Sequence, residues 1–322
     1  MSLPKTPHLS SSGPHRRVAL VTCAQLPDGD PDDAGLVPAL AELGIEASWQ
    51  VWDDERVFWQ QFGAVVLRSP WDYTSRRRDF LNWAESIPLR GPMLQNPADV
   101  LRWNTDKRYL LDLDRAGIPI VPTHWFEPGD DPGDWARIGS EFVLKPSVGA
   151  GSLGAGRFTL AEAADADAHL RGLQAAGRTV LAQPYLSQVD DIGERALIFF
   201  DGGFSHAITK AALLAPHARY ELGREPSQPT ERELFVQEHI SPARATADEV
   251  AVAEQVLGYV RDRFGEAPLY LRVDLLPTPA APVVCEVELV EPSLFFHFDD
   301  QAVTRYTRAL ARRISAGAPV SG

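Results

Sequence analysis

The sequence is poor in the residues and runs that mark secreted, metal-binding or membrane proteins. Its 322 residues include two cysteines, Cys23 and Cys285, and both lie in apolar, strand-like runs, which predicts buried core thiols and not a disulfide or a metal pair. The eight histidines contain no HExxH or similarly close ligand spacing. Residues 1–15 lack the apolar stretch of a signal peptide, so we predict a disordered leader there. These absences together indicate a cytoplasmic protein.

Positive charge and long apolar runs are also missing. The formal net charge is -13, which argues against a nucleic-acid partner or an anionic membrane surface. No apolar run is long enough to cross a bilayer. What remains is a chain with 44% hydrophobic residues, long enough for two or three domains with substantial cores.

The segment 16–95 alternates strands and helices, which predicts a doubly wound α/β domain with a parallel sheet. The expected strands are 17–24, 45–52, 64–68 and a short one around Met93, and the expected helices are 32–43 and 75–86. Arg68 ends the third strand, where open α/β sheets bind ligands, so it is a candidate clamp for a substrate carboxylate. A surface arginine packed by Trp71 and Tyr73 is an equally good interpretation.

The segment 96–122 connects this domain to the next. It predicts a helix that begins near Thr105 and ends at Gly117, followed by a short strand over 118–123. Lys107 would lie in the first turn of this helix. The helix dipole mildly disfavours a cation there, which leaves room for a reason beyond stability.

A glycine-rich stretch follows a strand that ends in Lys145-Pro146. Four glycines stand between this strand and another that begins at Phe158. Their spacing matches a dinucleotide fingerprint only formally, because a strand and not a helix follows, and there is no P-loop sequence. We therefore predict a flap whose backbone N–H groups close over nucleotide phosphates beside Lys145. The alternative is a mobile loop with a surface lysine.

The next segments predict a helix over 161–176, a strand over 179–185 that stops at Pro184, and a hairpin of strands 194–200 and 204–210 that ends at Lys210. Residues 215–233 form a long polar loop, which is typical of a lid or of disorder. Helices are expected over 247–264 and 299–316. We divide the chain at residues 15, 95, 122 and 188 into a leader, an N-terminal α/β domain, a linker, a small lid subdomain (123–188) and a C-terminal subdomain (189–322).

Residues 269–291 alternate apolar and charged side chains and predict two antiparallel strands around a Pro- and Ala-rich turn. With the turn near residue 280, Asp274 pairs with Glu286 and Arg272 pairs with Glu288. One face of the hairpin is then apolar, and the other carries one guanidinium and three carboxylates.

This charged face supports two interpretations. Carboxylates that lie together repel each other unless a cation separates them, and Mg²⁺ prefers such oxygen ligands. A solvated outer face is the other interpretation. The strict alternation places Cys285 on the apolar face and Val284 on the charged face, and an apolar Val284 there argues for partial burial.

The ordered set of features resembles the ATP-grasp superfamily, which includes glutathione synthetase, D-alanine–D-alanine ligase and RimK-type enzymes. The set comprises an α/β N-terminal domain, a strand lysine before a glycine-rich flap, a Gln-Pro hinge, a second strand lysine, Arg-x-Asp and Glu-x-Glu. It spans roughly residues 16–315. The phrases VVLRSPWDY, WNTDKRYLL, FVLKPSVGAGSLGAGRF and EVELVEPSLFF are most similar to the O-ureido-serine cyclo-ligase branch of cycloserine biosynthesis. The resemblance implies the α+β ATP-grasp fold, with two subdomains that sandwich ATP.

The resemblance also implies which residues bind ATP. They are Lys107, Lys145, Ser147, Gly149, Gly151, Ser152, Gly154, Gln183, Pro184, Tyr185, Leu186, Asp190 and Glu194. The two lysines and the flap match phosphate contacts, and residues 183–186 match the hinge beside adenine. Asp190 or Glu194 would contact the ribose. The family usually has a glutamate at or near Gln183.

For catalysis, the resemblance implies roles for Arg272 and Lys210, with Arg68 as the substrate clamp. Asp274, Glu286 and Glu288 match the ligands of two Mg²⁺ ions, for which Mn²⁺ is a substitute. The family usually has asparagine at the third position, so Glu288 adds a negative charge. Glu291, Pro292 and Ser293 replace a common Pro-Gly, and family contacts do not transfer there.

The implied enzyme is an ATP-dependent carbon–nitrogen ligase. It would convert a small amino-acid-derived carboxylate to an acyl phosphate, which an amine-type nitrogen attacks, with release of ADP and phosphate. Intramolecular cyclisation of O-ureido-serine is the sharpest version, and ligation of two amino acids is the close alternative. A non-catalytic ATP-binding module and a small-molecule phosphotransferase are further alternatives. Relatives commonly form homodimers, although the sequence points to no interface.

Overall fold

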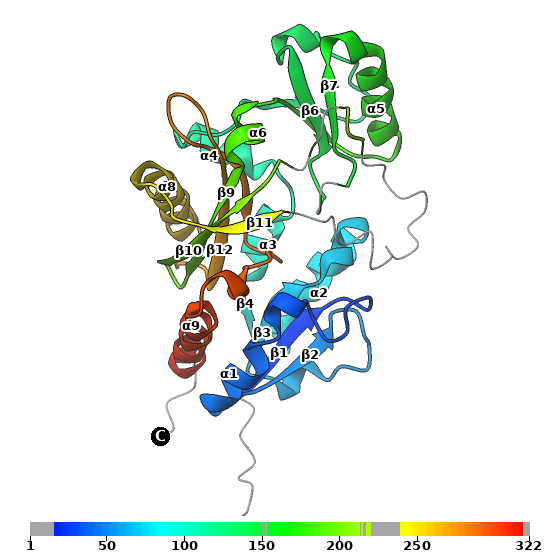
Figure 1. Cartoon of the computed structure of the whole chain (residues 1–322). Coiled ribbons are helices and arrows are strands. Elements are labelled where there is room, and N and C mark those ends of the chain that lie inside the picture. Colours follow the sequence, from blue (N-terminus) through cyan, green and yellow to red (C-terminus); the bar gives the residue numbers. More distant parts are fainter. Residues whose placement is uncertain are drawn as a thin grey trace, which may run out of the picture.

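The computed structural model describes residues 16–149, 151, 153–212, 214, 217–219 and 239–317. The predicted leader, Ser152 and most of the predicted lid loop 215–233 lie outside the described residues. The described chain contains three sheets, and the mixed α/β fold class is confirmed. In Figure 1 the N-terminal sheet lies at the bottom, the small sheet with β6 and β7 at the top, and the sheet containing β9 and β12 on the left between them.

The N-terminal sheet is parallel and has the order β2-β1-β3-β4. Its elements are β1 (Arg17–Thr22), α1 (Leu36–Glu42), β2 (Glu46–Val51), β3 (Ala64–Ser69), α2 (Arg77–Leu89) and β4 (Met93–Gln95). α1 and α2 contribute to different hydrophobic clusters on the two faces, so the doubly wound prediction is confirmed. α1 begins later than predicted because Pro31–Asp33 form a separate 3₁₀ turn capped by the Asp30 side chain.

The linker segment differs from its prediction. It forms two short helices, α3 (Ala98–Asn104) and α4 (Tyr109–Arg115), where the sequence predicted one beginning near Thr105. Lys107 consequently lies in the turn between the helices and not in a first helical turn. The predicted strand 118–123 is reduced to a single bridge between Ile120 and Val284. Its prolines at 119 and 122 remove the donors that a longer ladder needs.

The small sheet is antiparallel, with the order β5-β8-β6-β7. It consists of β5 (His124–Phe126), β6 (Glu141–Pro146), β7 (Gly156–Thr159) and β8 (Val180–Pro184), and α5 (Ala163–Ala175) covers one face. Phe142, Phe158 and Leu170 belong to a hydrophobic cluster made entirely by this part of the chain. The small subdomain therefore has its own core.

The third sheet is antiparallel, with the order β11-β10-β9-β12-β13. Its elements, with the neighbouring helices, are α6 (Gln188–Ile192), β9 (Glu194–Phe200), β10 (Gly203–Lys210), β11 (Ile240–Ala243), α8 (Ala247–Phe264), β12 (Tyr270–Leu276), β13 (Val283–Glu288) and α9 (Ala302–Gly317). β9 and β10 form the predicted hairpin, with positive φ at Asp201 and Gly202 as a type I′ turn requires. α6 and β11 were not predicted.

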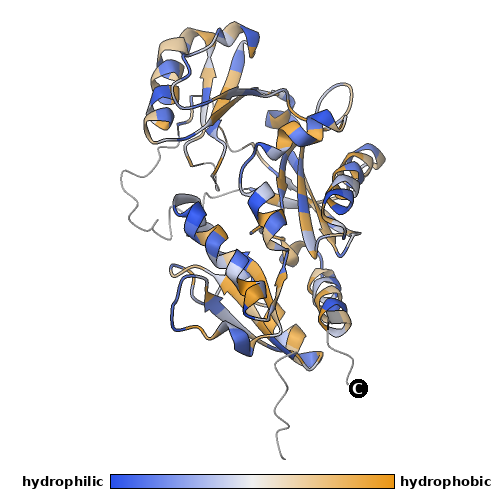
Figure 2. Ribbon diagram, turned by 180° about the vertical axis from the view of Figure 1, so that it is seen from behind, coloured by the Kyte–Doolittle hydropathy of each residue, from blue (hydrophilic) through white to orange (hydrophobic). Residues whose placement is uncertain are grey.

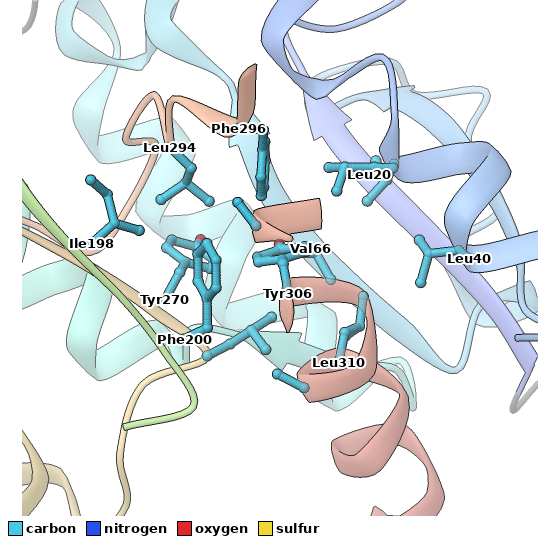
Figure 3. Close-up of a cluster of buried hydrophobic side chains, with 14 of the residues drawn as sticks. Leu20, Leu40, Val66, Ile198, Phe200, Tyr270, Leu294, Phe296, Tyr306 and Leu310 are labelled. Atoms are coloured by element: carbon cyan, nitrogen blue, oxygen red, sulfur yellow. The ribbon is translucent and has the colours of Figure 1, made fainter. Parts of the chain in front are cut away.

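One hydrophobic cluster joins the N-terminal domain to the third sheet. It combines Leu20 and Leu40 of the N-terminal domain with Tyr270 of β12 and Tyr306 and Leu310 of α9, as Figure 3 shows. In Figure 2 the apolar colour is most continuous on strands of the N-terminal sheet, while the helices carry both apolar and polar residues. Because this core is shared, the two parts are held in a fixed relation. No helix among the described residues combines the length and apolarity needed to cross a bilayer.

Candidate active site

A cavity of about 480 Å³ lies where the three sheets meet. Its walls come from the small sheet, the linker turn, the β12–β13 hairpin and the N-terminal domain. The predicted site residues on its walls are Lys107, Lys145, Gly149, Gly151, Gln183, Pro184, Tyr185, Leu186, Glu194, Lys210, Arg272, Asp274, Glu286 and Glu288. Residues from distant parts of the sequence therefore meet around one space.

The β12–β13 hairpin has the predicted register. Arg272 pairs with Glu288 and Asp274 pairs with Glu286. Beyond Asp274 the register shifts, so that Leu275 pairs with Val284 and Cys285 becomes the extra residue of a β-bulge. The bulge reverses the predicted faces of the two neighbours: Val284 is fully buried in the core, while Cys285 lines the cavity. The prediction of Cys285 as a core thiol is wrong, whereas Cys23 is fully buried as predicted.

Arg272, Asp274 and Lys210 form a buried charged network on this face. The Arg272 guanidinium donates to both oxygens of Asp274 at 2.9 Å, and Lys210 Nζ lies 2.8 Å from Asp274 Oδ2. Glu194 also pairs with Lys210, and Glu288 pairs with Arg272. Burial raises the pKa of Asp274, but Arg272 and Lys210 outweigh it and hold the pKa of this carboxyl below its usual range. Asp274 is therefore ionised at neutral pH.

A second group of charges surrounds Glu286. Lys107 Nζ lies 2.8 Å from Glu286 Oε1 and donates to the Gly149 carbonyl at 3.0 Å, which links the linker turn to the glycine-rich flap. Burial opposes ionisation of Glu286, but Lys107 and Lys145 lower its pKa. Lys145 Nζ lies 4.0 Å from the Cys285 sulfur. Burial raises the pKa of this thiol to about 11, so Cys285 is protonated at neutral pH.

The carboxylates Asp274, Glu286 and Glu288 are the residues that could hold a metal ion. Their oxygens are the donor type that Mg²⁺ prefers, so the chemistry of the set fits this ion. Each carboxylate is turned toward a lysine or arginine, however. Among the described residues, no three Asp, Glu, His or Cys side chains converge closely enough to hold a metal. Binding of a cation here would require these carboxylates to turn from their present partners.

The flap and hinge residues divide into two groups. Gly149 and Gly151 line the cavity, while the Ser147 backbone pairs with Lys107 and Thr179, and the Gly154 carbonyl accepts a hydrogen bond from His169. Ser147 and Gly154 thus shape the loop without forming the wall. In the hinge, the Gln183 amide donates to the Thr123 hydroxyl at 2.9 Å, which fixes the end of β8 beside the cavity.

Asp190 does not face the cavity. It lies in α6, where it accepts a hydrogen bond from the Tyr185 hydroxyl and lies 3.5 Å from the Arg157 guanidinium. Arg157 in turn lies over the Tyr185 ring, 3.4 Å from its centroid. Of the two predicted ribose contacts, only Glu194 is on the wall. The unpredicted helix α6 explains the difference, because it turns Asp190 toward the hinge.

Arg68 is also absent from the cavity wall, which corrects its prediction as a substrate clamp. Its side chain is 1% exposed and pairs with Asp33, also 1% exposed, at 3.0 Å. It also donates to the Pro292 carbonyl at 3.0 Å. A buried arginine needs such a partner, and this one joins the N-terminal domain to the segment after β13.

The sequence prediction missed part of the wall. These residues are Asp30, Trp71, Tyr73, Asn104, Glu291, Ser293 and Phe295. The Asn104 side chain holds the free edge of β13, donating to the Val287 carbonyl and accepting from the Leu289 N–H. Phe295 has a φ of 53°, which is rare for a bulky residue and marks a constrained backbone. Trp71 and Tyr73 next to a strand end carried a usable signal, but the prediction treated them as packing.

Two glutamates in the cavity have strongly raised pKa values. Burial raises the pKa of Glu288 to about 7, against the opposing effect of Arg272. Burial, reinforced by Glu288, raises the pKa of Glu291 to about 8. Clefts that hold such perturbed groups are typical of functional sites.

The protein-family model for the D-cycloserine synthetase DcsG, N-terminal domain, matches residues 18–96. Several solved structures share the fold. The crystal structure of D-cycloserine synthetase DcsG is 36% identical, with a TM-score of 0.81 over 92% of this chain and 99% of that chain. D-alanine–D-alanine ligase from Bacillus anthracis, solved with ATP, is 13% identical, with a TM-score of 0.61 over 94% and 99% of the two chains. A RimK domain ATP-grasp protein from Sphaerobacter thermophilus is 18% identical, with a TM-score of 0.59 over 92% and 98%.

The cycloserine biosynthesis protein DcsG of Streptomyces lavendulae is 36% identical over 307 residues, which cover 92% of this chain and 98% of that protein. The match covers nearly the whole length of both proteins, so it extends well beyond the N-terminal domain. The chain therefore belongs to the DcsG family of ATP-grasp carbon–nitrogen ligases.

Proposed function

We propose that the protein uses ATP to activate the carboxylate of a small amino-acid-derived molecule for attack by a nitrogen nucleophile. The observation that carries the proposal is the wall on which Lys107, Lys145, Lys210 and Arg272 meet the carboxylates of the β12–β13 hairpin in one cavity. Such a set of cations can neutralise the charge that develops on a transferred phosphoryl group. The alternative of a non-catalytic ATP-binding module gives no reason for Arg272 and Lys210 to be held together.

ATP would occupy the cavity between the small sheet and the third sheet. Lys107, Lys145 and the N–H groups near Gly149 and Gly151 would contact its phosphates, and the hinge 183–186 would lie beside the adenine. Asp274, Glu286 and Glu288 would hold Mg²⁺, which would screen the negative charge of the phosphates when bound. The related structures solved with ATP, or with Mg and ADP, support this use of the fold.

The chemistry has two steps. A substrate carboxylate oxygen attacks the γ-phosphorus of ATP, and the bond from this phosphorus to the bridging oxygen breaks. ADP leaves, and an acyl phosphate is formed. A nitrogen then attacks the acyl carbon and loses its proton, a C–N bond forms, and phosphate leaves. Arg272 would stabilise the oxyanion of the tetrahedral stage, and Lys210 the charge on the phosphoryl group.

The substrate that we propose is O-ureido-serine, with ring closure in place of ligation between two molecules. The support is the identity to a cycloserine biosynthesis protein, which extends over both domains. The ureido nitrogen attached to oxygen would attack the activated carboxyl of the same molecule. The resulting ring is one water lighter than the substrate, and hydrolytic loss of its carbamoyl group, as carbon dioxide and ammonia, gives cycloserine.

The test is release of ADP and phosphate from Mg-ATP with purified protein, over a panel of O-ureido-serine, free amino acids and amino-acid pairs. We expect O-ureido-serine to stimulate stoichiometric ADP and phosphate release, with a cyclised product by mass spectrometry. Stimulation only by amino-acid pairs, with a dipeptide product, would replace cyclisation with intermolecular ligation. A phosphorylated stable product would indicate phosphotransfer, and ATP binding without release by any compound would indicate a binding module.

A further inference from the structure

Glu291 occupies the end of the cavity where the N-terminal domain meets the β12–β13 hairpin. The Tyr73 hydroxyl donates to its carboxylate, and the Trp71 indole donates to its backbone carbonyl at 3.0 Å. Tyr73 is 4% exposed and lines the cavity. The N-terminal domain therefore fixes both the side chain and the backbone of Glu291.

The segment around Glu291 is held at every residue. Five consecutive carbonyls each accept a side-chain hydrogen bond of 2.9–3.1 Å: Val290 from Tyr270, Glu291 from Trp71, Pro292 from Arg68, Ser293 from Arg272 and Leu294 from His206. The donors come from β3, the turn after it, β10 and β12. A segment bound in this way is preorganised, and it presents Glu291 to a ligand without further ordering.

Glu291 differs from most of the acidic residues that face the cavity. Asp30 and Asp32 also lack a lysine or arginine partner, but Asp30 accepts the backbone N–H of Asp32, and Asp32 pairs with His297. Glu194, Asp274, Glu286 and Glu288 each form an ion pair with a lysine or arginine. Among the described residues, Glu291 forms no ion pair and has the Tyr73 hydroxyl as its side-chain partner. A carboxyl group directed into a cavity without a protein cation is suited to a cation on the ligand, whose positive charge would favour the ionised form of the carboxyl.

Glu291 and Arg272 line the same cavity. Arg272 Nη1 lies 3.1 Å from the Ser293 carbonyl, and two residues of chain span at most about 7 Å. The α-nitrogen and the carboxyl carbon of an amino acid are joined through one carbon. A molecule with its carboxyl group beside Arg272 would therefore lie next to the segment that carries Glu291, in the cavity that both residues line.

We propose that Glu291, positioned by Tyr73, binds the α-ammonium group of the substrate and selects amino acids over carboxylic acids that lack an amine. The inference rests on the proposed function, because it assumes that the activated carboxyl lies beside Arg272. It assigns Glu291 to substrate specificity and Tyr73 to the positioning of Glu291.

The test compares O-ureido-serine with 3-(ureidooxy)propanoic acid, which is the same molecule without the amino group. Binding of each to wild type and Glu291→Gln, both saturated with Mg and a non-hydrolysable ATP analogue, is measured by calorimetry. Wild type should prefer the amino compound by at least about tenfold, and Glu291→Gln should lose about tenfold for this compound only. Tyr73→Phe should lose about threefold, also for this compound only. Glu254→Gln, an exposed change on α8, is the matched control and should behave as wild type.

Equal losses for both compounds in Glu291→Gln would overturn the inference, because a structural or nucleophile-binding role would not distinguish them. Unchanged binding in Glu291→Gln would overturn it as well. If O-ureido-serine does not bind wild type, alanine and serine are compared with propanoic and 3-hydroxypropanoic acids. Failure of both amino acids to bind would also overturn the inference. Phosphate release is measured separately, so a missing turnover would contradict the proposed function while the binding contrast still tests Glu291.

Discussion

Arg68 and Arg272 are two buried arginines that have the same kinds of partners but lie in different places in the molecule. Each pairs with an aspartate, Asp33 or Asp274, and each donates to a carbonyl of the segment after β13. Arg68 and Asp33 are enclosed between the N-terminal domain and α9, whereas Arg272 and Asp274 lie on the cavity wall. The comparison teaches that burial and pairing alone do not identify a site residue. The cavity distinguishes the arginine that we propose to act in the chemistry from the one that joins two domains.

The largest contrast is expected between the two aspartates in turnover. Asp274→Asn keeps the side-chain size but removes a charge that, on the proposed function, faces the reacting phosphates. Turnover should therefore fall by about 10³-fold or more while ATP still binds. The measurement is ADP release with Mg-ATP and substrate, with ATP affinity determined in parallel. Asp33→Asn is the control, and its turnover per folded molecule should stay within about threefold of wild type. Retained turnover in Asp274→Asn would refute the catalytic assignment.

The same pair of sites should show the opposite order in stability. Asp33→Ala leaves the Arg68 guanidinium buried without its carboxylate, so the free energy of unfolding should fall by about 3–5 kcal/mol. Urea unfolding followed by fluorescence measures this change. In Asp274→Ala the remaining carboxylates Glu194 and Glu288 still face Lys210 and Arg272, so the loss should be smaller. A larger loss at Asp274 than at Asp33 would contradict the division between a structural and a functional arginine.

A third contrast concerns pH. The pKa of Glu291 is raised from 4.5 to about 8, mainly by burial and then by the charges of Glu288 and Glu286. Tyr73 and Lys107 lower it by a smaller amount. Because the folded-state pKa exceeds the unfolded one, protonation of Glu291 stabilises the fold fully below about pH 4.5, and this stability is lost as the pH rises toward 8. Relative to wild type, Glu291→Gln should gain up to about 1.4 kcal/mol per pH unit between pH 5 and 8. Urea unfolding across this range measures it, and parallel curves would contradict the raised pKa.

The smallest contrast tests the bulge in β13. Val284→Ala removes methyl groups from the core and should cost about 1–3 kcal/mol of unfolding free energy. Cys285→Ala changes a side chain that lines the cavity, and should cost less than about 1 kcal/mol. The strict alternation predicts the reverse order. Thermal or urea unfolding of the two variants therefore decides which residue faces the core.

Local sequence patterns predicted much of the fold. The alternation in 269–291 predicted the pairing of Arg272 with Glu288 and of Asp274 with Glu286, because a two-residue period and a turn position define the register. α8 begins and ends at its predicted limits, 247 and 264, where Thr246 caps its N-terminus and Gly265 its C-terminus. The bulge at Cys285 could not be predicted in this way, since it depends on how Leu275 and Val284 pack against the helices behind the sheet.

The sequence by itself determined the fold class, the strands that carry the charged residues and the lysines that meet at the cavity, because these follow from periodicity and residue type. Only the tertiary structure decided which of two similar arginines faces the cavity, that Asp190 turns to the hinge, and that Glu291 stands beside Tyr73. The first and the last of these outcomes depend on contacts between segments more than 200 residues apart, such as Arg68 with Pro292 and Trp71 with Glu291. No local pattern encodes such contacts, because the packing of whole domains brings those residues together.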